Sequence, residues 1–365
     1  MSKKGQRQKN LTAAFIAGGL DEDRLRARHR FTQRSKDHQK HKTLKTALAR
    51  AAESEQIADI DALPAGRVVQ VHSVFSDVEV DGAIRLCVVR KTLHRTNETR
   101  VIVGDLVRIS EVQTPRTGRT ADDSPLREGV IERIEPRASI LTRAEVRQEK
   151  DKIVGQIPIL ANAEQMLIVA SLLLPRIKWG LVDRMIVAAL AGRVVPIVCL
   201  NKIDLAEGSD DRATTVESAD AAAEADDVLG YYEQIGIRCV RTSVNTGRGI
   251  GDLKSLLTGK LTALTGHSGV GKSSLIRAVQ PGLNVKVGEI SNYNNKGRHT
   301  TTSARIYHLD IGGSVVDTPG VRLFGLYGVA PDALIGFYPD VAAGTAPAWR
   351  VESYERILAS LAASR

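Results

Sequence analysis

The segment Gly266–Ser273 constrains the fold of this chain more than any other feature of the sequence. It reads GHSGVGKS and matches the phosphate-loop pattern GxxxxGK[ST]. The apolar run KLTALT, typical of a strand, precedes it, and SSLIRAV, typical of a helix, follows it. In such a loop the backbone N–H groups surround phosphates, glycines permit the tight path, and the helix N-terminus adds positive charge. The segment therefore predicts an α/β domain that binds a nucleotide through its phosphates.

Individual residues of this loop have separate predicted tasks. We expect the ammonium of Lys272 to bridge the β- and γ-phosphates during catalysis, and the hydroxyl of Ser273 to coordinate Mg²⁺. Nucleotide contacts are expected from the whole loop and the first helical turn, which comprise Gly266, His267, Ser268, Gly269, Val270, Gly271, Lys272, Ser273 and Ser274.

A second motif, Asn201-Lys202-Ile203-Asp204 (NKID), follows directly on the apolar run PIVCL. Parallel sheets bind ligands at the carboxyl ends of their strands, and this motif lies at such an end. A carboxylate at Asp204 can accept hydrogen bonds from N1–H and the exocyclic amine of guanine, donors that adenine does not present in that arrangement. Asn201 can tie the motif to the phosphate loop, and the stem of Lys202 can cover the base. The alternative is an exposed turn at a strand end.

Three shorter patterns complete a guanine-nucleotide site. SVNTG begins at Ser243 and Val244, where a backbone N–H can meet guanine O6. DTPG runs from Asp317 to Gly320 and suits a DxxG element that holds Mg²⁺ through water and senses the γ-phosphate. The loop GRHTTT offers threonines, of which we assign Thr301 to the Mg²⁺ shell. Together the five patterns predict a GTPase.

The order of these motifs along the chain is rotated. An ordinary GTPase runs from the phosphate loop through the switch threonine and DxxG to NKxD and the serine turn. Here NKID and the serine turn come first. Such a circular permutation is physically allowed, because domain termini often lie close together and rejoining them keeps the same sheet. As a consequence, DTPG leads directly into residues 321–365, and a movement that depends on the γ-phosphate would pass to that segment.

The residues before this α/β pattern predict a different fold. Short Val/Ile-rich runs alternate with polar residues and are separated by turn residues such as Asp81-Gly82, which predicts five strands and a small closed barrel of the OB type. We therefore expect a multidomain chain: a basic, largely disordered arm at 1–60, an OB-type β-barrel at 61–150, a circularly permuted α/β P-loop GTPase domain at 151–328, and a short C-terminal helical segment at 329–365.

The positive charge of the chain is concentrated in its first residues. Residues 1–50 hold 14 Lys and Arg against 4 Asp and Glu, whereas the whole chain carries a net charge of +9. Such an arm can contact a nucleic-acid backbone, and the alternative is a solvated tail. No apolar run approaches the roughly 18 residues that span a bilayer, and the 3 cysteines are widely spaced, which fits a reducing cytosol. We expect a cytoplasmic protein without a membrane partner.

The motif set resembles the RsgA (YjeQ) family over residues 60–330. The resemblance rests on a basic arm and an OB-like barrel followed by NKID, SVNTG, GHSGVGKSS, GRHTTT and DTPG in that order. Members are circularly permuted GTPases that assist late maturation of the small ribosomal subunit. The resemblance implies GTP or GDP with Mg²⁺, hydrolysis that the small subunit stimulates, and docking of the OB domain on ribosomal RNA near the decoding region. We expect a monomer.

Two residues near the switch motifs bear on hydrolysis. Val321 follows DTPG, where many GTPases place a glutamine that orients water, so we expect slow intrinsic hydrolysis. His299, in GRHTTT, matches the histidine proposed to substitute in this family and is a second catalytic candidate. The alternative is a loop histidine without a catalytic role.

The C-terminal segment departs from the family pattern. Members normally continue past DTPG into a zinc-binding domain with three cysteines and a histidine. Residues 321–365 contain neither residue type, and structural zinc needs four such ligands, so zinc is not expected. Instead, Trp349–Ala363 predicts a final amphipathic helix.

Three functional hypotheses follow. The first is a GTP-hydrolysing assembly factor that binds the small ribosomal subunit and its rRNA. The second is a nucleotide-dependent RNA-binding module with little intrinsic hydrolysis. The third, a P-loop ATPase or kinase that acts on a small molecule, is disfavoured by NKID.

Overall fold

The computed structural model describes residues 59–91, 93, 100–112, 127–147, 152–206, 216–283, 304–317, 326 and 329–362. Several predicted features lie outside these residues, namely positions 1–58 of the basic arm and the residues His299, Thr301, Gly320 and Val321. Asp317 is described through its backbone.

Five of the described strands close into a barrel, as the sequence predicts. Strand β1 pairs with both β2 and β4, which closes the ring β1-β2-β3-β5-β4. Alternate side chains fill its interior, among them Val68, Val78 and Ile109. Asp81 and Gly82 both have positive φ angles and form the tight turn between β2 and β3. The strands are β1 (Ala65–Val71), β2 (Ser76–Val80), β3 (Ala83–Val89), β4 (Leu106–Val112) and β5 (Arg127–Ile134).

The α/β domain is built on six of the described strands, in the order β10-β9-β8-β11-β13-β12. The first five are parallel and β12 is antiparallel to β13. Strand β8 is buried on both faces, which explains its continuous apolar sequence. The strands are β8 (Gln165–Ser171), β9 (Val195–Asn201), β10 (Arg238–Arg241), β11 (Leu261–Gly266), β12 (Arg305–His308) and β13 (Ser314–Asp317).

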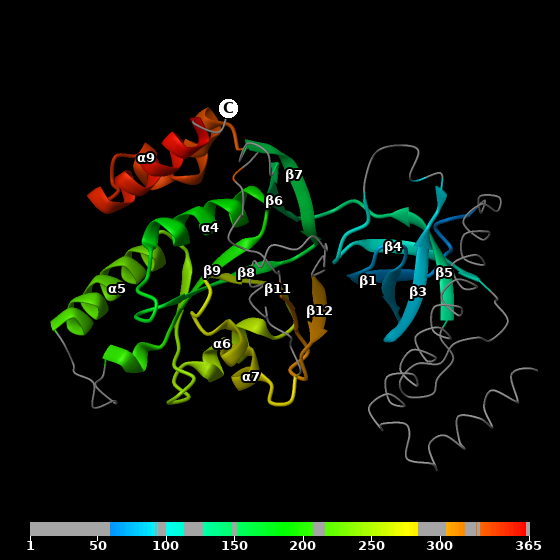
Figure 1. Cartoon of the computed structure of the whole chain (residues 1–365), viewed down its shortest axis with the longest axis horizontal. Helices are drawn as coiled ribbons and strands as arrows, with labels where there is room; N and C mark the ends of the chain where they lie inside the picture. Colours follow the sequence, from blue (N-terminus) through cyan, green and yellow to red (C-terminus); the bar gives the residue numbers. More distant parts are fainter. Residues whose placement is uncertain are drawn as a thin grey trace, which may run out of the picture.

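Helices cover both faces of this sheet (Figure 1). Helices α4 and α5 pack on one face with the C-terminal helix α9 (Ala348–Ala362), and α6 and α7 pack on the other. Strand β11, which carries the phosphate loop, lies in the middle of the sheet although β8, β9 and β10 precede it in the chain. The rotated motif order therefore still assembles a sheet with the phosphate loop at its centre. The helices are α4 (Trp179–Ala191), α5 (Val216–Gln234), α6 (Ile250–Leu257) and α7 (Lys272–Val279).

A β-hairpin that the sequence analysis did not identify connects the two parts. Strands β6 (Ile140–Arg147) and β7 (Lys152–Ala161) pair antiparallel in a separate two-stranded sheet. Two register shifts interrupt this pairing, so the strands lack the regular alternation that reveals a strand in sequence. The predicted domain boundary at 150/151 lies between these paired strands, and the domain limits remain a prediction.

The barrel and the α/β domain share a continuous sheet. Strand β1 pairs with β12 through Gln70 and Arg305, and the His308 Nε2 lies 2.9 Å from Glu79 Oε2 of β2. Val69 of β1 is buried in the core of the α/β domain, whereas its neighbour Val68 points into the barrel. In Figure 1 the barrel accordingly lies beside β12.

The C-terminal segment packs against α4 and α5 through a buried ionic network. Arg350 donates a hydrogen bond from Nη1 to Asp183 of α4 and another from Nε to Asp340 Oδ2, at 3.1 Å. Its guanidinium lies 4.2 Å from the ring centroid of Tyr338, and Tyr232 of α5 donates to Asp183 at 2.7 Å. The final helix predicted from the sequence is confirmed. The segment contains the 3₁₀ helix η3 (Pro331–Phe337), α8 (Pro339–Ala342) and α9 (Ala348–Ala362).

Arg350→Ala is expected to destabilise the fold by about 3–5 kcal/mol, the usual result of removing one partner of a buried ion pair. Both Asp183 and Asp340 would lose the buried cation between them. A lower urea midpoint, followed by circular dichroism, would report this loss. The control is Arg356→Ala, an exposed arginine on the same helix. Equal midpoints for the two variants would contradict a structural role for the network.

Candidate nucleotide-binding site

The phosphate loop joins β11 to α7 as the sequence predicts, and its glycines are required by close contacts. Gly266 has φ +142°, and a Cβ there would lie 2.1 Å from the carbonyl oxygen of Val169. Gly271 has φ +96°, and a Cβ there would lie 2.3 Å from the Asn201 amide nitrogen. Any larger residue at either position would push the loop away from β8 or β9.

Lys272 is the first residue of α7 and folds back over the loop. Its Nζ donates to the carbonyl oxygens of Gly266 at 2.8 Å and His267 at 3.0 Å. Ser273 follows in the first helical turn and is half-buried, whereas Ser274 is exposed. The ammonium and the helix N-terminus thus lie on the same loop, which gives it two sources of positive charge toward phosphates.

The NKID motif contacts the phosphate loop directly. The buried side chain of Asn201 donates from Nδ2 to the Val270 carbonyl at 2.9 Å, which confirms the predicted tie. Thr242 Oγ1 lies 3.2 Å from Asn201 Oδ1 and donates to it, which orients the amide. Thr242 could not be identified from the sequence, because the residue before SVNTG carries no signal of its own.

Asp204 is buried and held by the serine turn that follows β10. Ser243 Oγ donates to Oδ1 at 2.6 Å, and Asn245 Nδ2 donates to Oδ2 at 2.9 Å. Burial raises the pKa of Asp204, but the hydrogen bonds from Ser243 and Asn245 outweigh it, so the pKa lies below its ordinary value. The carboxylate is therefore ionised at neutral pH and can accept further hydrogen bonds. Asn245, the third residue of SVNTG, is a second contact that was not predicted from the sequence.

Lys202 and Ile203 complete the motif. Lys202 has a positive φ angle of +62°, and its Nζ donates to the carbonyl of Leu174, in the turn after β8. Ile203 is buried in the core beside α4 and α5 and begins the 3₁₀ helix η1 (Ile203–Ala206). Val244 is half-buried against the core of α6 and α7.

The structure places three of the five predicted motifs, NKID, SVNTG and the phosphate loop, at one edge of the sheet, together with Asp317, the first residue of DTPG. Asp317 ends β13 opposite Leu264 of β11, two residues before Gly266. NKID, SVNTG and the phosphate loop are linked by the side-chain contacts of Asn201 and Asp204. The fifth motif, GRHTTT, lies outside the described residues.

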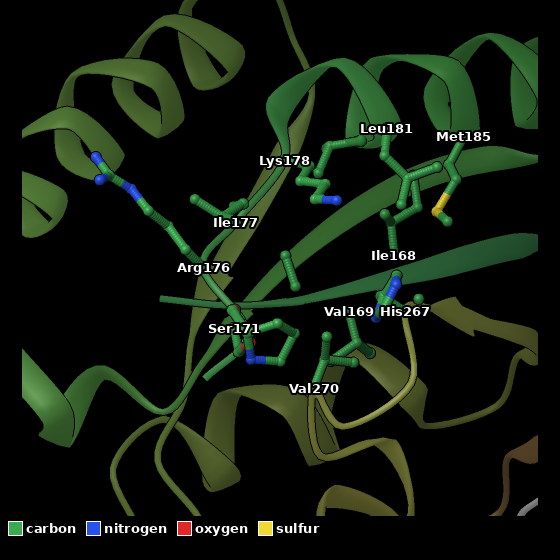
Figure 2. A pocket seen from close by; sticks show the side chains of 14 residues that line it. Ile168, Val169, Ser171, Arg176, Ile177, Lys178, Leu181, Met185, His267 and Val270 are labelled. Carbon is green, nitrogen blue, oxygen red and sulfur yellow. The ribbon is translucent and has the colours of Figure 1, made fainter. Parts of the chain in front are cut away.

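An apolar cavity lies between the phosphate loop and α4, and no sequence pattern indicated it. Figure 2 shows His267 and Val270 of the loop on one side, and Leu181 and Met185 of α4 on the other. Ile168 of β8 lies between them. The α4 side of the candidate site is therefore apolar, whereas the NKID side is polar.

The described part of the chain carries neither a candidate metal cluster nor a candidate membrane-spanning helix. No group of three or more His, Cys, Asp or Glu side chains there is arranged to hold a metal ion. None of the helices described is long and apolar enough to cross a membrane.

Comparison with known proteins identifies the family. The family model of the RsgA GTPase matches residues 134–327. The chain belongs to the RsgA GTPase family. A small ribosomal subunit biogenesis GTPase RsgA from Sodalis glossinidius is 36% identical over 273 residues, which cover 74% of this chain and 70% of that protein. The resemblance predicted from the motifs is thereby confirmed.

Other relatives match a smaller part of their own length. The small ribosomal subunit biogenesis GTPase RsgA 1 of Vibrio vulnificus (strain YJ016) is 40% identical over 210 residues, 58% of this chain and 54% of that protein. The chain thus spans about half the length of this relative, as it does for RsgA 1 of Vibrio parahaemolyticus, where the match covers 52%.

Solved structures support the fold. YjeQ from Thermotoga maritima is similar with a TM-score of 0.60 and 26% identity, over 83% of this chain and 99% of that one. YloQ, described as a circularly permuted GTPase, has a TM-score of 0.59 at 21% identity, over 85% of this chain and 99% of that one. The predicted OB-type barrel and circularly permuted P-loop domain are confirmed at the level of the fold.

Proposed function

We propose that this protein binds GTP, hydrolyses it to GDP, and assists late maturation of the small ribosomal subunit. One observation carries the proposal: Asn201 donates to Val270, so the motif for guanine and the loop for phosphates form one site. Asp204 supplies an ionised carboxylate in that motif. The relatives from Sodalis glossinidius and Vibrio vulnificus, named as small ribosomal subunit biogenesis GTPases, support the substrate and the partner.

The proposed mechanism relies on positioning and charge neutralisation. Lys272 would hold the β- and γ-phosphates while a water attacks the γ-phosphorus in line with the leaving oxygen. The hydroxyl of Ser273, an oxygen ligand beside Lys272, suits a hard cation, and Mg²⁺ held there would neutralise phosphate charge. Thr301 is proposed to coordinate Mg²⁺, and Asp317 and Gly320 are proposed to contact the γ-phosphate. The residues proposed to contact guanine are Asn201, Lys202, Ile203, Asp204, Ser243 and Val244.

Slow intrinsic hydrolysis is part of the proposal. Val321 cannot orient or deprotonate water, and His299 is the candidate that would do so in its place. The small ribosomal subunit is the proposed stimulus of GTP hydrolysis. The protein would act as a cytoplasmic monomer and would bind the rRNA of that subunit. The proposed domain limits stay at 1–60, 61–150, 151–328 and 329–365.

GTP turnover with purified small subunits titrated in tests this function. Turnover is expected to be slow alone and to rise with the concentration of subunits until it saturates. ATP is expected to compete poorly with GTP. Saturable subunit binding without any rise in turnover would support a nucleotide-dependent RNA-binding module instead, and equal competition by ATP would support a P-loop ATPase or kinase.

Deletion of residues 1–50 is expected to weaken small-subunit binding and to flatten its dependence on salt. Each lost phosphate contact should reduce the slope of log K against log salt concentration by about 0.7–0.9. The affinity for GDP serves as the control and should not change. An unchanged salt slope would mean that the arm is a solvated tail.

A further inference from the structure

The turn after β8, Ser171–Pro175, contacts the NKID strand. Ser171 pairs in register with Asn201, and the Leu172 N–H donates to the Asn201 carbonyl at 3.0 Å. The buried hydroxyl of Ser171 donates to the Pro175 carbonyl at 2.7 Å, which closes the turn on itself. The conformation of the turn is therefore fixed from the end of β8, directly beside Asn201, the first residue of the guanine motif.

The carbonyl of Leu174 accepts a hydrogen bond from Lys202 Nζ. Both residues have left-handed backbone conformations, with φ +52° for Leu174 and +62° for Lys202. Bulky residues adopt this conformation rarely, and only where the surrounding structure demands it. The side chain of Leu174 is 74% exposed, so its own packing does not account for the conformation. What the conformation does achieve is to present the carbonyl to Lys202.

The same turn lies against the phosphate loop. A Cβ on Gly269 would lie 3.6 Å from Pro175 Cδ, an ordinary van der Waals distance. Pro175 also lines the cavity beside the loop residues Gly266 and His267. Figure 2 shows that the Arg176 side chain extends away from the cavity. It pairs with Glu224 of α5 at 3.1 Å. The turn is thus held between the two halves of the site and a neighbouring helix.

We propose that the Ser171–Pro175 turn positions Lys202 for guanine-nucleotide binding, with the Leu174 carbonyl as the contact and Ser171 as the residue that fixes it. This inference rests on the proposed function. A lysine stem has four rotatable bonds, and holding its ammonium in advance removes part of the entropy lost when the stem covers a base. In this proposal Ser171 is a positioning residue, because its hydroxyl donates to the Pro175 carbonyl within the turn.

A double-mutant cycle tests the turn, with the dissociation constant of fluorescently labelled GDP as the measurement. Ser171→Ala and Lys202→Met, which keeps the apolar stem, are each expected to weaken GDP binding about fivefold, the equivalent of one net hydrogen bond. Because both variants release the same contact, the double variant is expected to lose no more than either single variant. Additive losses, about 25-fold together, would overturn the proposal.

Two further variants separate positioning from general damage. Ser171→Thr retains the hydroxyl and is expected to restore wild-type affinity, whereas a loss as large as that of Ser171→Ala would overturn the proposal. Ser255→Ala removes an exposed hydroxyl on α6, which donates to the Gly251 carbonyl at 3.2 Å, and is expected to leave GDP binding unchanged. If Ser255→Ala lost as much GDP affinity as Ser171→Ala, that result would also overturn the proposal.

The preference for guanine over adenine distinguishes this proposal from the proposed function. Lys202 would cover any purine, so Ser171→Ala should weaken GDP and ADP by the same factor and leave their ratio unchanged. If the wild-type chain shows no guanine preference, the proposed function fails and this inference fails with it. If the preference is intact and the cycle is additive, only the role of the turn fails.

Discussion

Lys272→Ala is expected to lower the maximal GTP turnover rate, measured with saturating small subunits, by about 10²–10³-fold. Removing one preorganised donor that stabilises transition-state charge has an effect of this size in other enzymes. The ammonium donates to the Gly266 and His267 carbonyls, so it already lies over the loop where the phosphates would bind. Alanine leaves the backbone of the loop intact but removes the cation that would stabilise charge on the γ-phosphate.

The control for this experiment is Lys260→Ala. Lys260 lies just before β11, at the opposite end from the phosphate loop, and pairs on the surface with Glu164 at 2.9 Å. Its loss removes one positive charge from the same region of the chain and should leave turnover unchanged. If stimulated turnover survived in the Lys272 variant, the phosphate loop would not be the catalytic site.

Asp204→Asn is expected to weaken GTP binding by at least about 30-fold and to create binding of xanthosine triphosphate. Two guanine donors would face an amide instead of a carboxylate, at roughly 1–3 kcal/mol for each misplaced contact. Xanthine carries a carbonyl where guanine carries the exocyclic amine, so the new amide can donate to it. Competition of the two triphosphates against labelled GDP measures the change.

Two controls distinguish a change in base preference from a folding defect. Asp252→Asn makes the same substitution on the exposed face of α6 and should not alter base preference. Asn245 Nδ2 donates to Asp204 Oδ2, so the new amide NH₂ of Asp204→Asn can face the NH₂ group of Asn245, donor against donor. The thermal unfolding of the variant should therefore be compared with that of the wild type. Full GTP affinity in a folded Asp204→Asn variant would falsify the guanine assignment.

The individual motifs were predictable because each depends on neighbours in the chain. Gly266 and Gly271 stand where the loop needs positive φ, and the strand and helix around them follow from the local apolar pattern. The Asn201 contact with the phosphate loop was also predicted, because strand ends of a parallel sheet meet at one edge.

The features that the sequence did not predict are of two kinds: contacts between residues that are distant in sequence, and strands whose alternation of apolar and polar residues is irregular. The β6–β7 hairpin was not predicted, because its two register shifts break the alternation of apolar and polar residues along the strands. Thr242 and Asn245 contact Asn201 and Asp204 across 41 residues, and such a pairing follows from strand order rather than from either segment alone. Nothing in the apolar letters SLLLP distinguishes a turn that holds Lys202 from a continued strand.

The sequence by itself determined the class of domain and the rotated order of the motifs, and it supplied the residues proposed to contact guanine and phosphate. These depend on backbone conformation, periodicity and residue chemistry, which act within a few positions along the chain. Only the tertiary structure decided that β1 of the barrel pairs with β12, that Arg350 holds α9 to α4 beside Asp183, and that the Leu174 carbonyl receives Lys202. Such contacts depend on how packed elements meet in space, because close packing brings together side chains that no local pattern relates.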